Sequence, residues 1–232
     1  MKALIFDVDG TMADTERDGH LPACNQAFAR LDIPIQWTWD EFKTMLPIGS
    51  NAQRMRLALQ KLPQPPVELD SVVANLVKLK QQFYIEQFVP HLPLRAGVRR
   101  LIHEAAGRNI RLAIVSSSDE PQIYALLRYR LPEFETCFDP VLGKLVGPKT
   151  APDSPLYRHC LELLGASPAE TLVIEDSEVG FRAAQTAGLP CAVIYNDYTY
   201  GQNFTGAALV ARSLEYFDLD RLAALCLPDN GS

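Results

Sequence analysis

Two aspartates stand one residue apart at the end of a short apolar run near the start of the chain. Residues 3–11 read Ala-Leu-Ile-Phe-Asp-Val-Asp-Gly-Thr, so Asp7 and Asp9 follow directly after four apolar residues. Such a run is typical of a buried strand in a parallel sheet, and ligands of open α/β sheets collect at the carboxyl ends of these strands. Burying two acids there is costly unless a cation shares the site. The segment therefore predicts a metal-dependent active site, in which the hydroxyl and backbone N–H of Thr11 are available to an anion.

The same segment has two other interpretations, an acidic turn after a strand and a calcium-binding loop. Gly10 comes too early for a loop of the EF-hand type, and the later ligands of that pattern are missing. An acidic turn stays open on this segment alone, so the choice depends on the other motifs.

A second acidic pair, Glu175 and Asp176, ends another apolar run at 171–174. In a parallel sheet the two strand ends meet at one edge, so we expect Asp176 to lie near Asp7. Carboxylate oxygens from separate strand ends, together with waters, are the usual ligands of Mg2+. The alternative is that Asp176 or Ser177 is only the N-cap of the following helix, and the two roles are compatible.

A run of serines follows a third apolar segment, 111–115. Ser116 and Ser117 precede a helix start at Asp119, and a hydroxyl there, with the N–H groups of the helix start, would bind a phosphate oxygen. Serines at strand exits are also common helix caps, so both roles fit the pattern.

Lys149 lies in the stretch Gly147–Asp153, between Pro148 and Pro152. Because prolines fix the backbone, a lysine held between them is better interpreted as a positioned cation than as a solvated surface charge. The segment Gly143–Thr150 is not a P-loop, since its spacing is G-x-x-x-G-x-K-T and Pro148 lacks the N–H that such a loop needs.

Strand and helix patterns alternate in the elements that must position these residues. Apolar runs predict strands at 3–6, 111–115, 171–174 and 191–195, with a short edge strand at 208–210. Helical patterns lie between or after them, at 98–106, 121–127, 155–164, 180–187 and 214–225. The alternation predicts an α/β fold, a doubly wound parallel sheet of Rossmann-like type with helices on both faces.

Residues 17–90 interrupt this rhythm with amphipathic helical patterns and no strong strand signal. The helices are expected at 21–31, 39–46, 52–62 and 69–87, with prolines separating the last two. We therefore expect a core domain made of residues 1–16 and 91–232 and an inserted all-helical cap domain at 17–90.

Composition limits the partners and the compartment. The chain has 232 residues, 47% of them apolar, and its net charge of −6 with no basic cluster excludes a nucleic-acid partner. Five scattered cysteines without C-x-x-C spacing indicate buried thiols of a reduced protein. With Lys2 leading straight into a core strand and no apolar stretch approaching about 20 residues, we expect no signal peptide, no membrane partner and a cytoplasmic location.

Taken together, Asp-x-Asp-Gly-Thr, the strand-end serine, the lysine in a proline-rich loop and the strand-end Glu-Asp resemble the haloacid dehalogenase superfamily of phosphotransferases and phosphatases. The resemblance spans residues 3 to about 195 and covers all four signature segments. It implies a Mg2+-dependent phosphatase acting on a small phosphorylated metabolite, with a helical cap inserted after the first motif.

The resemblance also implies roles for the acids. Asp7 would be the nucleophile that forms an aspartyl phosphate. Mg2+ would be held by Asp7, by the main-chain carbonyl of Asp9 and by Asp176. The Asp9 carboxyl group would protonate the leaving group and then activate water, which requires the closed site to raise its pKa.

The remaining core motifs would serve the phosphate. Ser116 and Lys149 would neutralise its oxygens, and Lys149 would also orient the nucleophile. Glu175 would support either the lysine or the water shell of the metal.

The resemblance extends into the predicted cap and the segments next to it, which are similar to the CbbY-type branch of the superfamily. That branch acts on sugar bisphosphates. They include Asp14-Thr15-Glu16, Cys24–Phe28, Gly49 and Pro93–Val98. In that branch the matching cap positions face the substrate, which implies substrate contacts from Glu16, His20, Arg54 and Lys80.

This chain departs from the branch at a few positions. Ala52 replaces a lysine, Thr150 replaces a proline, and Asp119 and Glu120 add negative charge near the expected phosphate site. These differences leave the identity of the sugar phosphate open.

Three alternative functions follow from the same motifs. A phosphomutase of the β-phosphoglucomutase type would use Asp7 and Asp9 but lose its phosphate to water more slowly. A dehalogenase is disfavoured by Asp9, the second acid, and a non-catalytic phosphosugar-binding module is disfavoured by the complete motif set. The oligomeric state is not determined, and a monomer is compatible with the sequence.

Overall fold

The computed structural model describes residues 1–48, 50–150 and 153–226, so Gly49 and Pro152 of the motifs above lie outside it. The chain forms two compact units. One consists of Met1–Asp14 and Pro93–Ser232, and the other is the intervening segment Thr15–Leu92. The inserted unit is therefore two residues longer at each end than the expected segment 17–90. In the described part of the chain, no helix combines the length and apolar content that crossing a bilayer requires.

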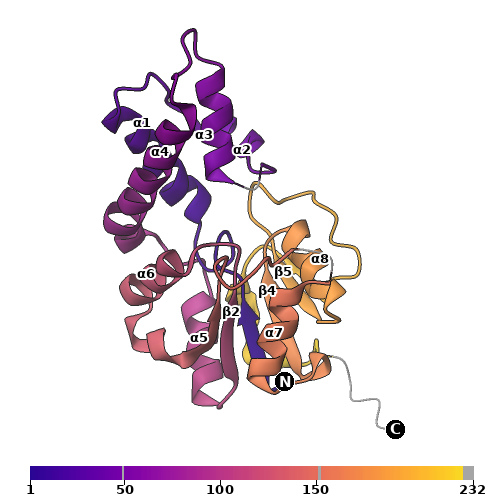
Figure 1. The fold of residues 1–232 in the computed structure, drawn as a ribbon. Coiled ribbons are helices and arrows are strands. Elements are labelled where there is room, and N and C mark those ends of the chain that lie inside the picture. The colour runs from indigo at the N-terminus through magenta and orange to yellow at the C-terminus, as the bar shows by residue number, and fades with distance from the viewer. Residues whose placement is uncertain (49, 151–152, 227–232) are drawn as a thin grey trace. The chain divides into compact units, whose positions relative to one another are not determined.

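The first unit is built on a six-stranded parallel sheet with the order β3-β2-β1-β4-β5-β6. The first strand lies in the middle, with β2 on one side and β4 on the other, so the winding reverses next to it. This confirms the predicted doubly wound α/β sheet (Figure 1). The strands are β1 (Ala3–Phe6), β2 (Arg111–Val115), β3 (Phe138–Leu142), β4 (Thr171–Glu175), β5 (Cys191–Ile194) and β6 (Leu209–Ala211).

Helices cover both faces of this sheet (Figure 1). One face packs its alternate residues, Ile5 and Val173 among them, against the apolar sides of α7 and α8. Residues that point the other way, such as Leu4 and Phe6, are also fully buried, which explains why the central strands are apolar throughout. The helices are α5 (Val98–Gly107), α6 (Glu120–Arg130), α7 (Pro155–Leu164), α8 (Glu178–Thr186) and α9 (Leu219–Ala223).

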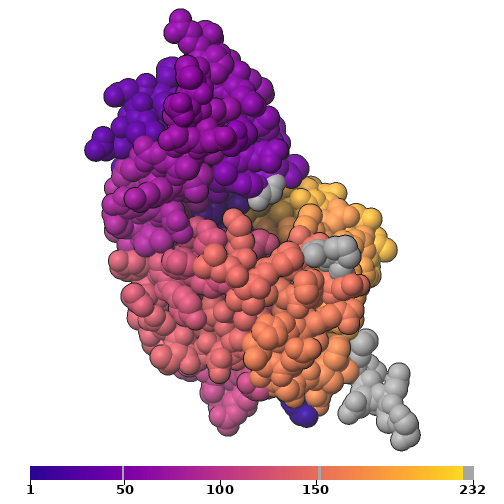
Figure 2. Space-filling view, viewed as in Figure 1, coloured from indigo at the N-terminus to yellow at the C-terminus, as the bar shows by residue number. Residues whose placement is uncertain are grey.

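The second unit is helical, as predicted. Its core is a cluster of apolar and aromatic side chains that includes Phe28, Trp37 and Phe42. Helix α2 begins with a capping box, in which Thr38 and Glu41 satisfy each other's backbone N–H groups. Its residues are coloured from indigo to purple in Figure 2. Its helices are α1 (Leu21–Arg30), α2 (Trp39–Thr44), α3 (Asn51–Gln60) and α4 (Leu69–Phe83), with π-helical turns at Glu16–His20 and Tyr84–Phe88.

The structure corrects two expectations about secondary structure. Strand β3 is absent from the strands predicted above, because Asp139 and Pro140 interrupt its apolar pattern. Proline is tolerated there because β3 lies at an edge of the sheet. The single helix expected at 214–225 is wrong. The chain forms a 3-10 turn and then α9, since Asp218 is extended and accepts a hydrogen bond from the N–H of Arg221 as the helix cap.

Candidate active site

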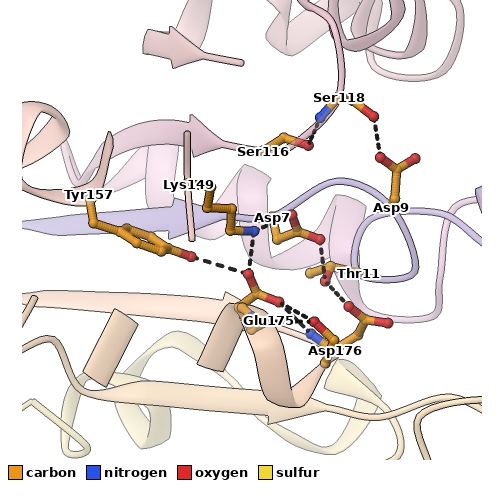
Figure 3. A network of polar contacts seen from close by, with 11 residues as sticks. Asp7, Asp9, Thr11, Ser116, Ser118, Lys149, Tyr157, Glu175 and Asp176 are labelled. Atoms are coloured by element: carbon orange, nitrogen blue, oxygen red, sulfur yellow. Dashed lines mark hydrogen bonds and ion pairs between the residues drawn. The ribbon is translucent and has the colours of Figure 1, made fainter. Parts of the chain in front are cut away.

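Parallel pairing brings the predicted core residues to one edge of the sheet (Figure 3). Phe6 of β1 aligns with Ile114 of β2 and Ile174 of β4. The residues that follow these three are therefore level with one another, which places Asp7 beside Glu175. This is the geometry expected from the strand ends alone.

Lys149 is buried between two of these acids, although much of the loop before it is exposed. Its Nζ lies 2.5 Å from Oδ1 of Asp7 and forms a second ion pair with Oε1 of Glu175. Only 5% of its surface is exposed, and its ammonium lies 5.8 Å from the centre of the Tyr157 ring. Burial alone would lower the pKa of Lys149, but the two carboxylates raise it above its ordinary value. The ammonium is therefore a permanent positive charge next to Asp7.

The Glu175 carboxylate is occupied by hydrogen-bond donors. Besides Lys149, its Oε1 accepts from the hydroxyl of Tyr157 at 3.2 Å, and its Oε2 accepts from the backbone N–H of Asp176 at 3.2 Å. Helix α8 makes room for it, because a Cβ on Gly180 would collide with this carboxylate. Of the two supporting roles expected for Glu175, this arrangement favours holding the lysine.

Asp7, Glu175 and Asp176 nevertheless form a buried acidic cluster that fits a divalent cation. One carboxylate oxygen from each lies within 4.8 Å of the others. The Thr11 hydroxyl lies 3.0 Å from Oδ2 of Asp7 and 3.5 Å from Oδ1 of Asp176. A single hydroxyl proton satisfies only one of these acceptors at a time, so lone pairs of both aspartates stay available. Hard oxygen ligands of this kind suit Mg2+.

The pKa shifts of the two aspartates show the same need for positive charge. Burial raises the pKa of Asp7 from its ordinary value of 3.8 to about 7, and the charge of Glu175 adds to the effect while Lys149 opposes it. Burial also raises the pKa of Asp176 well above its ordinary value, with further contributions from Asp7 and Glu175. A bound cation would stabilise the charged forms of both buried aspartates.

The serines after β2 have separate environments. Ser116 is buried, and its Oγ accepts a hydrogen bond from the backbone N–H of Ser118 at 3.1 Å. Ser117 is exposed. The hydroxyl of Ser118 donates to Oδ2 of Asp9, which is half-buried and points away from the Lys149 cluster in Figure 3. Ser118 is thus the serine that contacts the second aspartate.

Asn196 also belongs to the site and was not predicted. Its Nδ2 donates to Oδ2 of Asp176 at 2.7 Å and lies 3.4 Å from the carbonyl oxygen of Gly10. It follows β5. Asp7 and Asp176 were predicted because residues just after parallel strands meet at one edge of the sheet, and this strand-end rule applies to Asn196 as well. Tyr157 was missed for a different reason, since it lies on the buried face of α7 and has no such signal in the sequence.

Arg95 fixes the backbone around the first motif. Its guanidinium donates to the carbonyl oxygens of Gly10, Ile194, Tyr195 and Arg212. A planar group with five N–H donors is suited to several acceptors at once. The turn after Asp9 is therefore anchored to the ends of β5 and β6.

The four polar residues predicted in the helical unit form two pairs there, and all but the half-buried Glu16 are buried. Arg54 lies 3.7 Å from Glu16 and also donates to the carbonyl oxygens of Met45, Leu46 and Ile48. Nζ of Lys80 lies 2.9 Å from Nδ1 of His20, and both groups lie against the Tyr84 ring. The exposed fractions are 5% for Arg54, 3% for Lys80 and 4% for His20. Three buried basic side chains are unusual in a helical core.

Comparisons with known proteins agree with this geometry. Residues 1–188 match the family model described as haloacid dehalogenase-like hydrolase. The chain is 33% identical over 211 residues to the protein CbbY of Rhodobacter capsulatus, covering 89% of this chain and 91% of that protein. It is also 33% identical over 216 residues to a CBBY-like protein of Arabidopsis thaliana, covering 90% of this chain and 67% of that protein.

A solved structure has a similar fold. It is a mutant of CbbY from Rhodobacter sphaeroides in complex with xylulose-(1,5)bisphosphate, with a TM-score of 0.82 and 29% sequence identity. The match covers 96% of this chain and 99% of that one. The resemblance stated from the motifs is confirmed.

Proposed function

Because the chain belongs to the haloacid dehalogenase-like hydrolases, we propose that it releases phosphate from a small sugar phosphate or bisphosphate through an aspartyl phosphate on Asp7. It is a phosphatase of that family and is similar to CbbY proteins. The substrate, the metal and the residue roles below are parts of the proposal.

The contact between Lys149 and Asp7 carries the proposal. The buried ammonium, 2.5 Å from Oδ1, keeps one oxygen of Asp7 oriented and lowers the repulsion between this carboxylate and a phosphate. The other oxygen of Asp7, Oδ2, and Oδ1 of Asp176 both lie near the Thr11 hydroxyl, and these two acids are the ones expected to hold Mg2+. A nucleophile held between a fixed cation and a metal site is what attack on an anionic ester requires.

The reaction then has two steps on this chain's residues. An oxygen of Asp7 attacks phosphorus, the bond to the sugar oxygen breaks, and the leaving oxygen takes a proton from the Asp9 carboxyl group. In the second step Asp9 takes a proton from a water molecule that attacks the aspartyl phosphate. The products are inorganic phosphate and the free Asp7 carboxylate. Ser116 and Lys149 bind the oxygens of the transferring phosphoryl group.

Asp7, the main-chain carbonyl of Asp9 and Asp176 would hold Mg2+. The bound metal would supply positive charge to the phosphoryl oxygens. In the proposed role of the helical unit as a cap, Glu16, His20, Arg54 and Lys80 contact the rest of the substrate. Two cationic side chains among these four suit a second phosphate group, which supports a sugar bisphosphate as substrate.

A substrate panel tests the function. Purified protein with Mg2+ is incubated with sugar monophosphates and bisphosphates, and both free phosphate and sugar isomers are measured. Phosphate release that is fastest on a ketose bisphosphate supports the proposal. Isomer formation without phosphate release would indicate a phosphomutase. Rates on ketose bisphosphates no higher than those on monophosphates would exclude the bisphosphate assignment.

A further inference from the structure

The loop that leads to Lys149 is held by a carboxylate at the start of helix α6. Glu120 is the first residue of α6, and the loop is the stretch 143–146 that follows β3. Oε1 of Glu120 accepts hydrogen bonds from the backbone N–H groups of Gly143 at 3.0 Å and Val146 at 3.3 Å, and Oε2 accepts from Leu145 at 3.3 Å. Backbone N–H groups of one loop that converge in this way form a concave site for an anion, and here the chain supplies the anion itself.

Other contacts join the same two segments. The backbone N–H of Lys144 donates to the carbonyl oxygen of Ser118 at 2.9 Å, and the N–H of Ser116 donates to the carbonyl oxygen of Leu142 at 3.0 Å. Gly143 is buried in this junction, where a Cβ would lie 2.6 Å from the Ser118 oxygen and 2.8 Å from the Glu120 carboxyl carbon. The serine-bearing exit of β2 and the lysine-bearing loop are therefore packed together by backbone contacts.

Side-chain burial does not hold this loop. Leu145 is 75% exposed and Val146 is 50% exposed, so their apolar side chains contribute little to its position. Lys149, three residues after Val146, is 95% buried and must meet both Asp7 and Glu175. A buried lysine at the end of an exposed loop needs its backbone fixed by polar contacts, and Glu120 supplies three of them.

We propose that Glu120 is a positioning residue for catalysis, which fixes the loop 143–146 and thereby sets the position of the Lys149 ammonium against Asp7. The proposal rests on the phosphatase function given above. It replaces the expectation that Glu120 only adds negative charge near the phosphate. Its carboxylate is engaged by backbone donors and acts on the reaction through Lys149.

Three variants separate positioning from charge. Glu120→Ala removes all three hydrogen bonds. Glu120→Gln keeps an oxygen for Gly143 and Val146 but turns an amide toward the N–H of Leu145, so it retains part of the anchor. Asp119→Asn removes the same charge one residue away; Asp119 contacts the loop only through an ion pair with Lys144 at 3.9 Å.

Hydrogen exchange of the peptide spanning 143–148 and steady-state kinetics with Mg2+ give two independent readouts. For Glu120→Ala we expect faster exchange in this peptide and a kcat about tenfold lower, because small displacements of a catalytic group reduce the rate by such factors. KM should change by less than about twofold, since the proposal gives this loop no contact with the sugar. Glu120→Gln should fall between wild type and Glu120→Ala, and Asp119→Asn should match wild type.

Two results would overturn the proposal. One is wild-type exchange and kcat in Glu120→Ala. The other is a lower KM in both Glu120→Gln and Asp119→Asn, which would show that these acids act by repelling the substrate. If Glu120→Ala does not fold, the graded effect of Glu120→Gln carries the test. If the wild-type protein releases no phosphate, the proposed function fails, and the exchange measurement still decides whether Glu120 fixes the loop.

Discussion

The two units bury ionisable groups of opposite sign. In the α/β unit, three buried carboxylates, Asp7, Glu175 and Asp176, lie close together, and Lys149 pairs with the first two. In the helical unit, Arg54, Lys80 and His20 are buried, while Glu16 is only half-buried. In a chain whose net charge is −6, the buried ionisable side chains of the helical unit are thus mainly basic. The acidic cluster suits a metal, and the basic cluster suits an anionic substrate group.

The two clusters also differ in how they are held. The acidic cluster joins residues far apart in the sequence, since the two acids paired with Lys149 are Asp7 and Glu175. In the helical unit most contacts of Arg54 are local, to carbonyl oxygens within nine residues. Substitutions in the acidic cluster should therefore disturb several motifs at once, and those in the basic cluster should act on substrate binding more selectively.

The largest expected effect is that of Asp7→Asn. The amide cannot attack phosphorus, so kcat should fall by at least about 10^4-fold. Circular dichroism should show an unchanged fold, because the amide still fits the space beside Lys149. Phosphate release at the wild-type rate would exclude Asp7 as the nucleophile.

A smaller effect is expected for Asp176→Asn, which removes one charged ligand of the proposed metal site. The Mg2+ concentration for half-maximal activity should rise by more than about tenfold, with less change in kcat at saturating Mg2+. Titrating activity with Mg2+ measures this shift. Asn196→Ala, which removes the donor to Asp176 Oδ2, should shift the Mg2+ requirement in the same direction by a smaller factor. An unchanged requirement in both variants would separate Asp176 from metal binding.

The basic cluster can be tested by Lys80→Met, with Lys78→Met as the control on the same helix. Lys80 is buried and Lys78 is exposed. If Lys80 binds a second phosphate, Lys80→Met should raise KM for a sugar bisphosphate by about tenfold and leave a sugar monophosphate nearly unaffected, whereas the control changes neither. Equal losses on both substrates would indicate a structural role for Lys80.

The smallest expected effect concerns the stability of the metal-free protein. The pKa of Asp7 is raised to about 7 in the folded state, above its ordinary value of 3.8, so the folded state binds more protons than the unfolded state between about pH 4 and pH 7. The contribution of Asp7 to the free energy of unfolding is therefore fully present below about pH 4 and is lost as the pH rises to about 7. Between pH 5 and pH 8 in EDTA we expect Asp7 to lower Tm by about 5 °C, and Mg2+ to reverse most of the loss. Scanning calorimetry of wild type and Asp7→Asn isolates this contribution, because the variant lacks the titrating group.

The strand-end rule explains how much of the acidic cluster could be predicted. Parallel strands end at one edge of a sheet, so Asp7, Ser116 and Asp176 were found from the apolar runs before them. The same rule cannot tell which of three consecutive serines faces Asp9, because that depends on the backbone after β2. Tyr157 escapes it entirely, since its hydroxyl reaches Glu175 from a helix whose pattern is that of ordinary core packing.

The fold was also predicted from apolar runs, and this approach misses a strand that has no such run. Continuous apolar runs identified the central strands, but β3 at the edge contains an aspartate and a proline and has no such run. Sequence reasoning also assigned Glu120 as a free negative charge, because the three N–H groups it binds come from a loop 23 to 26 residues away. Long-range backbone contacts of this kind have no periodic signature.

Gly180 has a consequence for anyone who wishes to make this enzyme more heat-resistant. Replacing a glycine inside a helix by alanine ordinarily stabilises a protein by up to about 1 kcal/mol, so Gly180 in α8 is an obvious target. Here the added methyl group would collide with the Glu175 carboxylate. Replacing Gly180 by alanine to stabilise the helix would therefore displace the acid that holds Lys149, and this glycine should be left unchanged.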